Sequence, residues 1–235
     1  MSWRVTQVNI LSLSADAAAL SVEPSLAPGP SPVCQALARA GGASLRSALT
    51  QARFIPVGSA VELAPCALPF AHVFAAAAPI WLTGKANELL ALHRSYAALF
   101  QAAEAAGCRS IVLPFFSALR YRFPRGEAVK IALREAEGRD LEIIFAAETD
   151  ELYAISQRPY RKPKIVSYVG WYRDHAIFAL DNALFARVDL RPEITDVTII
   201  PYFEACFRAG NNPRQPPLPE SEIARLRRVY EENDW

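Results

Sequence analysis

Two arginines flank a tyrosine at Arg120-Tyr121-Arg122, and this group could bind a phosphorylated ligand. A guanidinium can donate two parallel hydrogen bonds to one phosphate. Tyr121 and the nearby Phe123 supply aromatic faces that could stack on such a ligand. The alternative is that both arginines are solvated loop residues and that the two aromatic rings cover the end of a sheet.

Glu23 and Cys34 are further side chains with chemistry that a catalytic site could use. A carboxylate can act as a general acid or base or bind a cation, and a thiolate can act as a nucleophile. No histidine stands near Cys34 in the sequence to activate it. We therefore favour a buried structural thiol for Cys34 and a salt-bridged residue at a strand end for Glu23.

The cysteines and histidines show no spacing typical of a metal site. The spacing lacks a CxxC pair, and no histidine follows a cysteine at the distance that zinc sites use. We expect no metal and no cofactor. The residues concerned are Cys34, Cys66, Cys108 and Cys206, with His72, His93 and His175.

The composition is that of a globular protein with a substantial core, since 52% of the residues are hydrophobic and 21% are charged. The formal net charge is +1, so no overall charge attracts the chain to nucleic acid, which we consider an unlikely partner. The N-terminus does not resemble a signal peptide, and the longest apolar run, 67–82, is interrupted by prolines. We expect a cytoplasmic protein that does not bind a membrane.

Short apolar runs alternate with amphipathic segments over the first 156 residues. Apolar side chains on one face predict a long helix over 85–106, which Gly107 should end. Gly41-Gly42 predicts a break between two shorter helices. The predicted strands are 3–11, 17–22, 59–65, 69–77, 110–113 and 141–146, and the predicted helices are 33–40, 43–51, 85–106, 125–137 and 149–156. This order predicts an α/β fold, with three α/β/α layers around a central mixed sheet.

The composition changes after residue 156. The segment 157–164, QRPYRKPK, predicts a basic linker that is held against the first domain by charge. Beyond it, runs rich in β-branched and aromatic residues predict strands, and 221–232 predicts a helix. The runs are 165–172, 175–181, 184–190 and 196–202. We therefore expect a domain over 1–156 and a C-terminal β-rich appendage over 157–235 that ends in a helix.

Four stretches of the first 156 residues, in the same order along the chain, resemble the macro domain family, which is known for binding ADP-ribose. They are NILSLSADAAAL (9–20), IPVGSAVELAPCALPFAHVFAAAAP (55–79), CRSIVLPFFSALRYRFPRGEAVKIAL (108–133) and LEIIFAAETDELYAI (141–155). The resemblance implies a macro-like fold and a site for ADP-ribose or a related nucleotide. It does not extend beyond residue 156.

The first ligand-binding loop that the resemblance implies departs from the family pattern. The family's second asparagine, which lies against the distal ribose, aligns with Glu23. The glycine run that brings backbone N–H groups to the diphosphate becomes Pro28-Gly29-Pro30-Ser31-Pro32, and each proline removes a donor. A position that is catalytic in some members aligns with Cys34 or its neighbour Val33. A carboxylate at Glu23 would repel a diphosphate.

The second implied loop spans Ser117 to Pro124, and Leu119 and Arg122 replace its two glycines. Tyr121 keeps the aromatic residue that lies over the distal ribose, and Phe123 adds another. At the adenine end, Asn9 replaces the acidic residue that pairs with the base. Its amide oxygen can still accept that hydrogen bond.

Three functions follow, and we rank them in this order. The first is a divergent macro-like domain that binds ADP-ribose or a related nucleotide with little or no hydrolase activity. The second is a protein-interaction scaffold with a collapsed pocket, in which 157–235 contacts a protein partner or another copy. The third is an ADP-ribosyl hydrolase, with Glu23 as a weak candidate for catalysis. Candidate anchors for a protein contact are Trp171, Tyr172, Tyr202 and Trp235.

Overall fold

The computed structural model describes residues 3–23, 25–82, 87–119, 123–158, 161–182, 184–191, 193, 197–200, 205 and 216–233. The chain divides into two compact units. The first comprises Met1–Trp81 and Asn87–Tyr160, and the second comprises Leu82–Ala86 and Arg161–Trp235. The predicted boundary after residue 156 remains a prediction.

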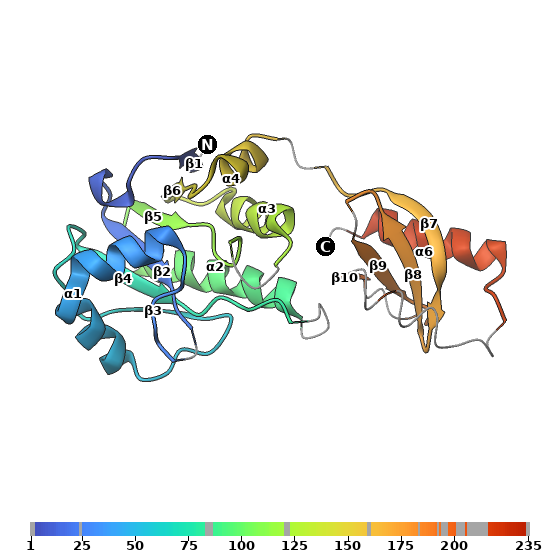
Figure 1. The fold of residues 1–235 in the computed structure, drawn as a ribbon, viewed down its shortest axis with the longest axis horizontal. Helices are drawn as coiled ribbons and strands as arrows, with labels where there is room; N and C mark the ends of the chain where they lie inside the picture. Colours follow the sequence, from blue (N-terminus) through green and yellow to red (C-terminus); the bar gives the residue numbers. More distant parts are fainter. Residues whose placement is uncertain are drawn as a thin grey trace. The chain divides into compact units, whose positions relative to one another are not determined.

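The first unit is built on a six-stranded sheet with the strand order β1-β6-β5-β2-β4-β3 (Figure 1). Neighbouring strands are parallel, except that β3 is antiparallel to β4. The mixed sheet that the sequence predicts is therefore confirmed. Because β2, β4, β5 and β6 run in the same direction, their carboxyl ends meet at one edge of the sheet. The strands are β1 (Trp3–Thr6), β2 (Ala17–Ser21), β3 (Ala60–Glu62), β4 (His72–Ala76), β5 (Ser110–Pro114) and β6 (Glu142–Ala146).

Helices cover both faces of this sheet, as the predicted three-layer fold requires (Figure 1). Alternate residues of β2 pack into different clusters, as the pleat of a strand dictates. Ala17 and Ala19 join the cluster of α2 and α3, whereas Ala18 and Leu20 join the cluster of α1. The helices are α1 (Pro32–Ala52), α2 (Glu88–Ala105), α3 (Arg125–Ala136) and α4 (Asp150–Ser156).

Most of the predicted elements exist, and one difference has a local cause. The predicted strand 3–11 is too long, because β1 ends at Thr6 and Asn9 caps the 3₁₀ turn η1 (Ile10–Ser12). The predicted helices 33–40 and 43–51 are both present within α1, and Gly42, with a φ of 52°, breaks the helical geometry between them as predicted. Gly107, with a φ of 77°, follows the end of α2 as predicted.

The second unit is a four-stranded antiparallel sheet with the order β10-β9-β8-β7, and α6 packs against β9. The antiparallel sheet and the C-terminal helix confirm the predicted β-rich appendage. Buried Ile223, Leu226 and Tyr230 form the apolar side of α6. The elements are β7 (Ile165–Tyr172), β8 (His175–Leu180), β9 (Phe185–Asp189), β10 (Val197–Ile200) and α6 (Glu220–Glu232).

The end of the basic segment, directly before β7, has contacts inside the second unit. Arg161 pairs with Asp181, and the Lys162 ammonium donates to the carbonyls of Glu231 and Asn233 at the C-terminal end of α6. The start of the segment, Gln157 and Arg158, donates to backbone carbonyls of α4 in the first unit. The predicted attachment of the segment to the first domain by charge remains a prediction.

Two of the four candidate anchors for a protein contact are described. Trp171 is half-buried and its Nε1 donates to the carbonyl of Pro216, and the Arg173 guanidinium lies over the ring of Tyr172. Tyr202 and Trp235 lie outside the described residues, as does Cys206. Among the described residues, no helix is long and apolar enough to cross a membrane.

Candidate functional site

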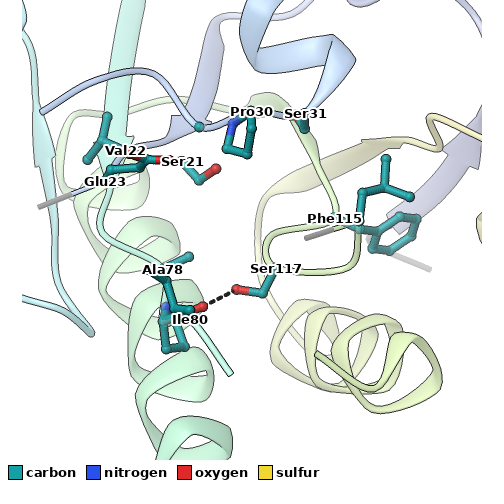
Figure 2. Close-up of a pocket in the computed structure, with 12 residues that line it drawn as sticks. Ser21, Val22, Glu23, Pro30, Ser31, Ala78, Ile80, Phe115 and Ser117 are labelled. Atoms are coloured by element: carbon teal, nitrogen blue, oxygen red, sulfur yellow. Dashed lines mark hydrogen bonds between the residues drawn. The ribbon is translucent and has the colours of Figure 1, made fainter. Parts of the chain in front are cut away.

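A hollow opens at the carboxyl edge of the first sheet, where the segments after β2, β4 and β5 approach one another (Figure 2). It encloses about 500 Å³ of space, part of it open to solvent. The part of it that a bound molecule could fill is about 40 Å³, which is below the usual range of small-molecule sites, roughly 300–1,000 Å³. The hollow is lined by Ser21, Val22, Glu23, Gly29, Pro30, Ser31, Ala78, Pro79, Ile80, Phe115, Ser117 and Leu119.

The loop after β2 is held tightly against its own strand. The Gly29 N–H donates to the Ser21 carbonyl at 2.7 Å, and the bridge between Val22 and Pro28 lies beside this contact. A Cβ on Gly29 would lie 2.4 Å from the Ser21 hydroxyl oxygen, so this position requires glycine for close approach. The one glycine of the loop therefore uses its N–H within the protein.

The first backbone N–H groups of α1 also have hydrogen-bond acceptors within the protein. Ser31 is the N-cap, and its side chain accepts from the Cys34 N–H at 3.1 Å. The Val33 N–H donates to Oε1 of Glu148 at 2.9 Å, and the Ser31 hydroxyl interacts with the same carboxylate. Glu148 follows β6, which is separated from β2 by β5 in the sheet, so a part of the chain distant in sequence supplies this anion. The first N–H groups of α1, which in many proteins bind phosphate, are here engaged internally.

The loop after β5 is fixed by two hydrogen bonds. The Ser117 hydroxyl donates to the Pro79 carbonyl at 2.7 Å, which joins the loops after β4 and β5 (Figure 2). The Phe116 N–H donates to the buried Tyr96 hydroxyl of α2 at 2.6 Å. Ser117 has a φ of 62°, a conformation that non-glycine residues adopt rarely and that such contacts stabilise.

We expect Tyr96→Phe to destabilise the first unit by about 1–3 kcal/mol, because the buried Phe116 N–H loses its acceptor. Urea unfolding followed by circular dichroism measures this change. Tyr153→Phe, at a half-buried position of α4, is the matched control and should change stability by under roughly 0.5 kcal/mol. Equal stability of Tyr96→Phe and the wild type would contradict the fixing role of this hydroxyl.

The hollow contains little charge. Glu23 is the one ionisable side chain among the described residues that line it. Burial raises the pKa of the neighbouring Glu148, and the hydrogen bonds from Ser31 and Val33 oppose this shift. Arg120, Tyr121 and Arg122 lie outside the described residues, so their predicted contact with phosphate remains a prediction.

Five of the residues predicted for the site line the hollow, namely Glu23, Gly29, Ser31, Ser117 and Leu119. Four others lie outside its described lining. Val33 is bound to Glu148, and Asn9 is exposed with its Oδ1 accepting from the Leu11 N–H at 3.1 Å. Cys34 is buried, and its burial raises the pKa of the thiol, which suits packing rather than nucleophilic attack. Phe123 is buried edge-on against Trp81, with ring centroids 5.0 Å apart.

The segment after β4 and the anion after β6 were not predicted from the sequence. Ala78, Pro79 and Ile80 line the hollow because β4 lies next to β2 and ends at the same edge. The order of the strands could have indicated them, since residues after parallel strands gather at one edge. Ser21, Val22, Pro30 and Phe115 are the other lining residues that were not predicted.

The fold and the site are those of one class of domain, a three-layer α/β/α domain with a hollow at the carboxyl edge of a mixed sheet. The model of the macro domain family matches residues 24–132. The "O-acetyl-ADP-ribose deacetylase" of Escherichia fergusonii is 34% identical over 134 residues, which cover 55% of this chain and 75% of that protein. The "O-acetyl-ADP-ribose deacetylase 1" of Pantoea vagans is 32% identical and covers 63% of this chain and 94% of that protein.

A solved structure, the "Oceanobacillus iheyensis macrodomain with ADP", superposes with a TM-score of 0.60 at 21% identity. The match covers 66% of this chain and 87% of that chain, and it supports the likeness of fold. The chain belongs to the macro domain family, as its sequence predicts.

Proposed function

We propose that the first unit binds ADP-ribose or a related nucleotide in the hollow and has little or no activity as an ADP-ribosyl hydrolase. The observation that carries this proposal is the hollow itself, which lies at the carboxyl edge of a macro-type sheet. Ligands of α/β proteins bind outside the carboxyl ends of parallel strands. The named relatives from E. fergusonii and P. vagans act on an ADP-ribose derivative, which favours this class of ligand.

The form of the lining supports binding of a nucleotide. Apolar Val22, Ile80, Phe115 and Leu119 offer surface for a base or a ribose, while the serine hydroxyls offer polar contacts. Arg120 and Arg122 follow Leu119 directly in the sequence. We propose that these arginines supply the positive charge for the phosphates, since the described lining supplies none.

Weak hydrolysis follows from how the backbone donors are used. Catalysis by such a site depends on donors that are aimed at developing charge before the reaction. Gly29, Val33 and Cys34 direct their N–H groups to acceptors within the protein. Pro28, Pro30 and Pro32 have no N–H to offer. We therefore expect binding without efficient turnover.

Calorimetric titration of the full chain with ADP-ribose tests binding, and a thermal-shift assay supports it independently. A binding heat together with a rise in Tm is expected. Absence of both would remove the proposal. Hydrolysis is assayed with O-acetyl-ADP-ribose and with ADP-ribosylated protein, and rapid turnover that Glu23→Ala abolishes would instead establish a hydrolase.

We expect Glu23→Gln to tighten binding of ADP-ribose by on the order of fivefold, because a carboxylate in the lining repels the diphosphate. Titration at low and at high salt measures the change, and the gain should shrink with salt because solvent ions screen this charge. Glu62→Gln, at an exposed position of β3, is the control and should bind like the wild type. Weaker binding by Glu23→Gln would show that Glu23 contacts the ligand favourably.

A further inference from the structure

Glu148 is an anion at the place where α1 would otherwise present free N–H groups. Its Oε1 accepts from Val33, and its carboxylate also interacts with the Ser31 hydroxyl. Its Oε2 is buried and has no hydrogen-bond partner among the described residues. Ser31 in turn lines the hollow, so one residue separates this carboxylate from the space that a ligand would occupy.

The use of this carboxylate differs from ordinary helix capping. Ser31 caps α1 from within the loop but accepts only from the Cys34 N–H, so the Val33 N–H is left for an acceptor from elsewhere. Glu148 comes from a distant part of the sequence and places a negative group on the positive end of the helix dipole. A ligand phosphate at the start of α1 would lie close to this carboxylate, and the two negative groups would repel each other.

We infer that Glu148 is a specificity-determining residue, which fills the anion position at the start of α1 and disfavours ligands that place a phosphate there. This inference rests on the proposed function and refines it. The preferred ligands are then those whose negative charge lies toward the loop after β5. Glu148 acts on the ligand through charge and through Ser31, so it is a positioning residue and not a catalytic one.

The charge state of Glu148 links this selectivity to pH. Among the described residues, the titratable groups on which Glu148 has an electrostatic effect are Cys34 of α1 and Tyr96 of α2. Burial raises the pKa of both, so both stay neutral below about pH 8. Burial also raises the pKa of Glu148, and lowering the pH through that value neutralises its carboxylate. Anion binding by the wild type should therefore strengthen as the pH falls through this range.

The experiment compares ADP-ribose binding by the full-length wild type, Glu148→Gln and Glu148→Asp, by calorimetry across this pH range. Glu148→Gln keeps an oxygen for the Val33 N–H and removes the charge, so we expect about tenfold tighter binding at neutral pH and a flat pH profile. Glu148→Asp keeps the charge but has a shorter reach, so it should show no such gain. Glu142→Gln, at the exposed start of β6, is the matched control.

Each outcome decides a different claim. Tighter binding by Glu148→Gln alone supports the inference, even where the wild type binds too weakly to measure and the proposed function fails. Equal binding by Glu148→Gln and the wild type overturns the inference and leaves the function standing. A gain in Glu148→Asp as large as in Glu148→Gln overturns it as well, because loosening of the loop then explains both. Binding by none of the proteins overturns both claims.

If Glu148→Gln fails to fold, as its Tm and circular dichroism would show, the pH profiles of the wild type and of Glu23→Gln take its place. Both proteins retain Glu148, so binding should tighten in each as the pH falls. A flat profile in Glu23→Gln would assign the pH dependence to Glu23 and overturn the inference.

Discussion

Ala78→Phe is expected to reduce the affinity for ADP-ribose by at least about 100-fold, which corresponds to roughly 2.7 kcal/mol. Ala78 follows β4 and lines the hollow (Figure 2). A benzyl group there would fill the space of about 40 Å³ that the hollow has for a bound molecule. The ligand would then have to displace the side chain or bind outside, and calorimetric titration measures the loss.

The control for this prediction separates filling of the hollow from damage to the fold. Ala40→Phe places the same side chain at an exposed position of α1 and should leave affinity unchanged. Both variants are compared with the wild type by thermal unfolding, and the Tm of Ala78→Phe must stay close to that of Ala40→Phe. Undiminished binding by a folded Ala78→Phe would place the ligand elsewhere on the protein.

Phe145→Ala is expected to destabilise the first unit by about 3–5 kcal/mol, the usual range for loss of a buried phenylalanine. Phe145 lies on β6 with no exposed surface. Its ring stacks on Phe115, with centroids 4.8 Å apart, and meets Tyr96 edge-on. Because Phe115 lines the hollow, the cavity left by this change should also loosen the loop after β5.

Denaturant unfolding of the full chain, followed by a signal from the first unit, measures this loss. Phe54→Ala is the matched control, because Phe54 is 67% exposed and its removal should change stability by under roughly 0.5 kcal/mol. If Phe145→Ala unfolds at the same denaturant concentration as Phe54→Ala, the packing described here around β6 is wrong.

Local signals in the sequence determined most of the fold. The apolar face of 85–106 and the glycine at 107 predicted α2 to within a few residues, because periodicity and capping are properties of neighbouring residues. The strand 3–11 was predicted too long because its apolar residues gave no sign that Asn9 would cap a turn. The break between two helices at Gly42 was predicted, because a glycine that takes a positive φ interrupts a helix locally.

The residues of the site were harder to predict from the sequence than the fold was. Resemblance to the macro family indicated Glu23, Gly29 and Ser117, which lie on the two loops that the resemblance implies. Ala78 and Glu148 reach the site from strands far away in the sequence, and their approach is set by the parallel register. Proximity between residues of different strands leaves no pattern among neighbouring residues, so it cannot be predicted from a single sequence.

The rigidity of the loop after β2 affects the entropy and the rate of ligand binding. Pro28, Pro30 and Pro32 restrict its backbone, and Gly29 is fixed on Ser21 before any ligand arrives. The loop therefore loses little conformational entropy when a ligand binds, and it does not need to close over the ligand. A ligand should therefore bind this hollow as a preformed site. Its association should be fast, and its dissociation rate should depend on how well its shape complements the lining.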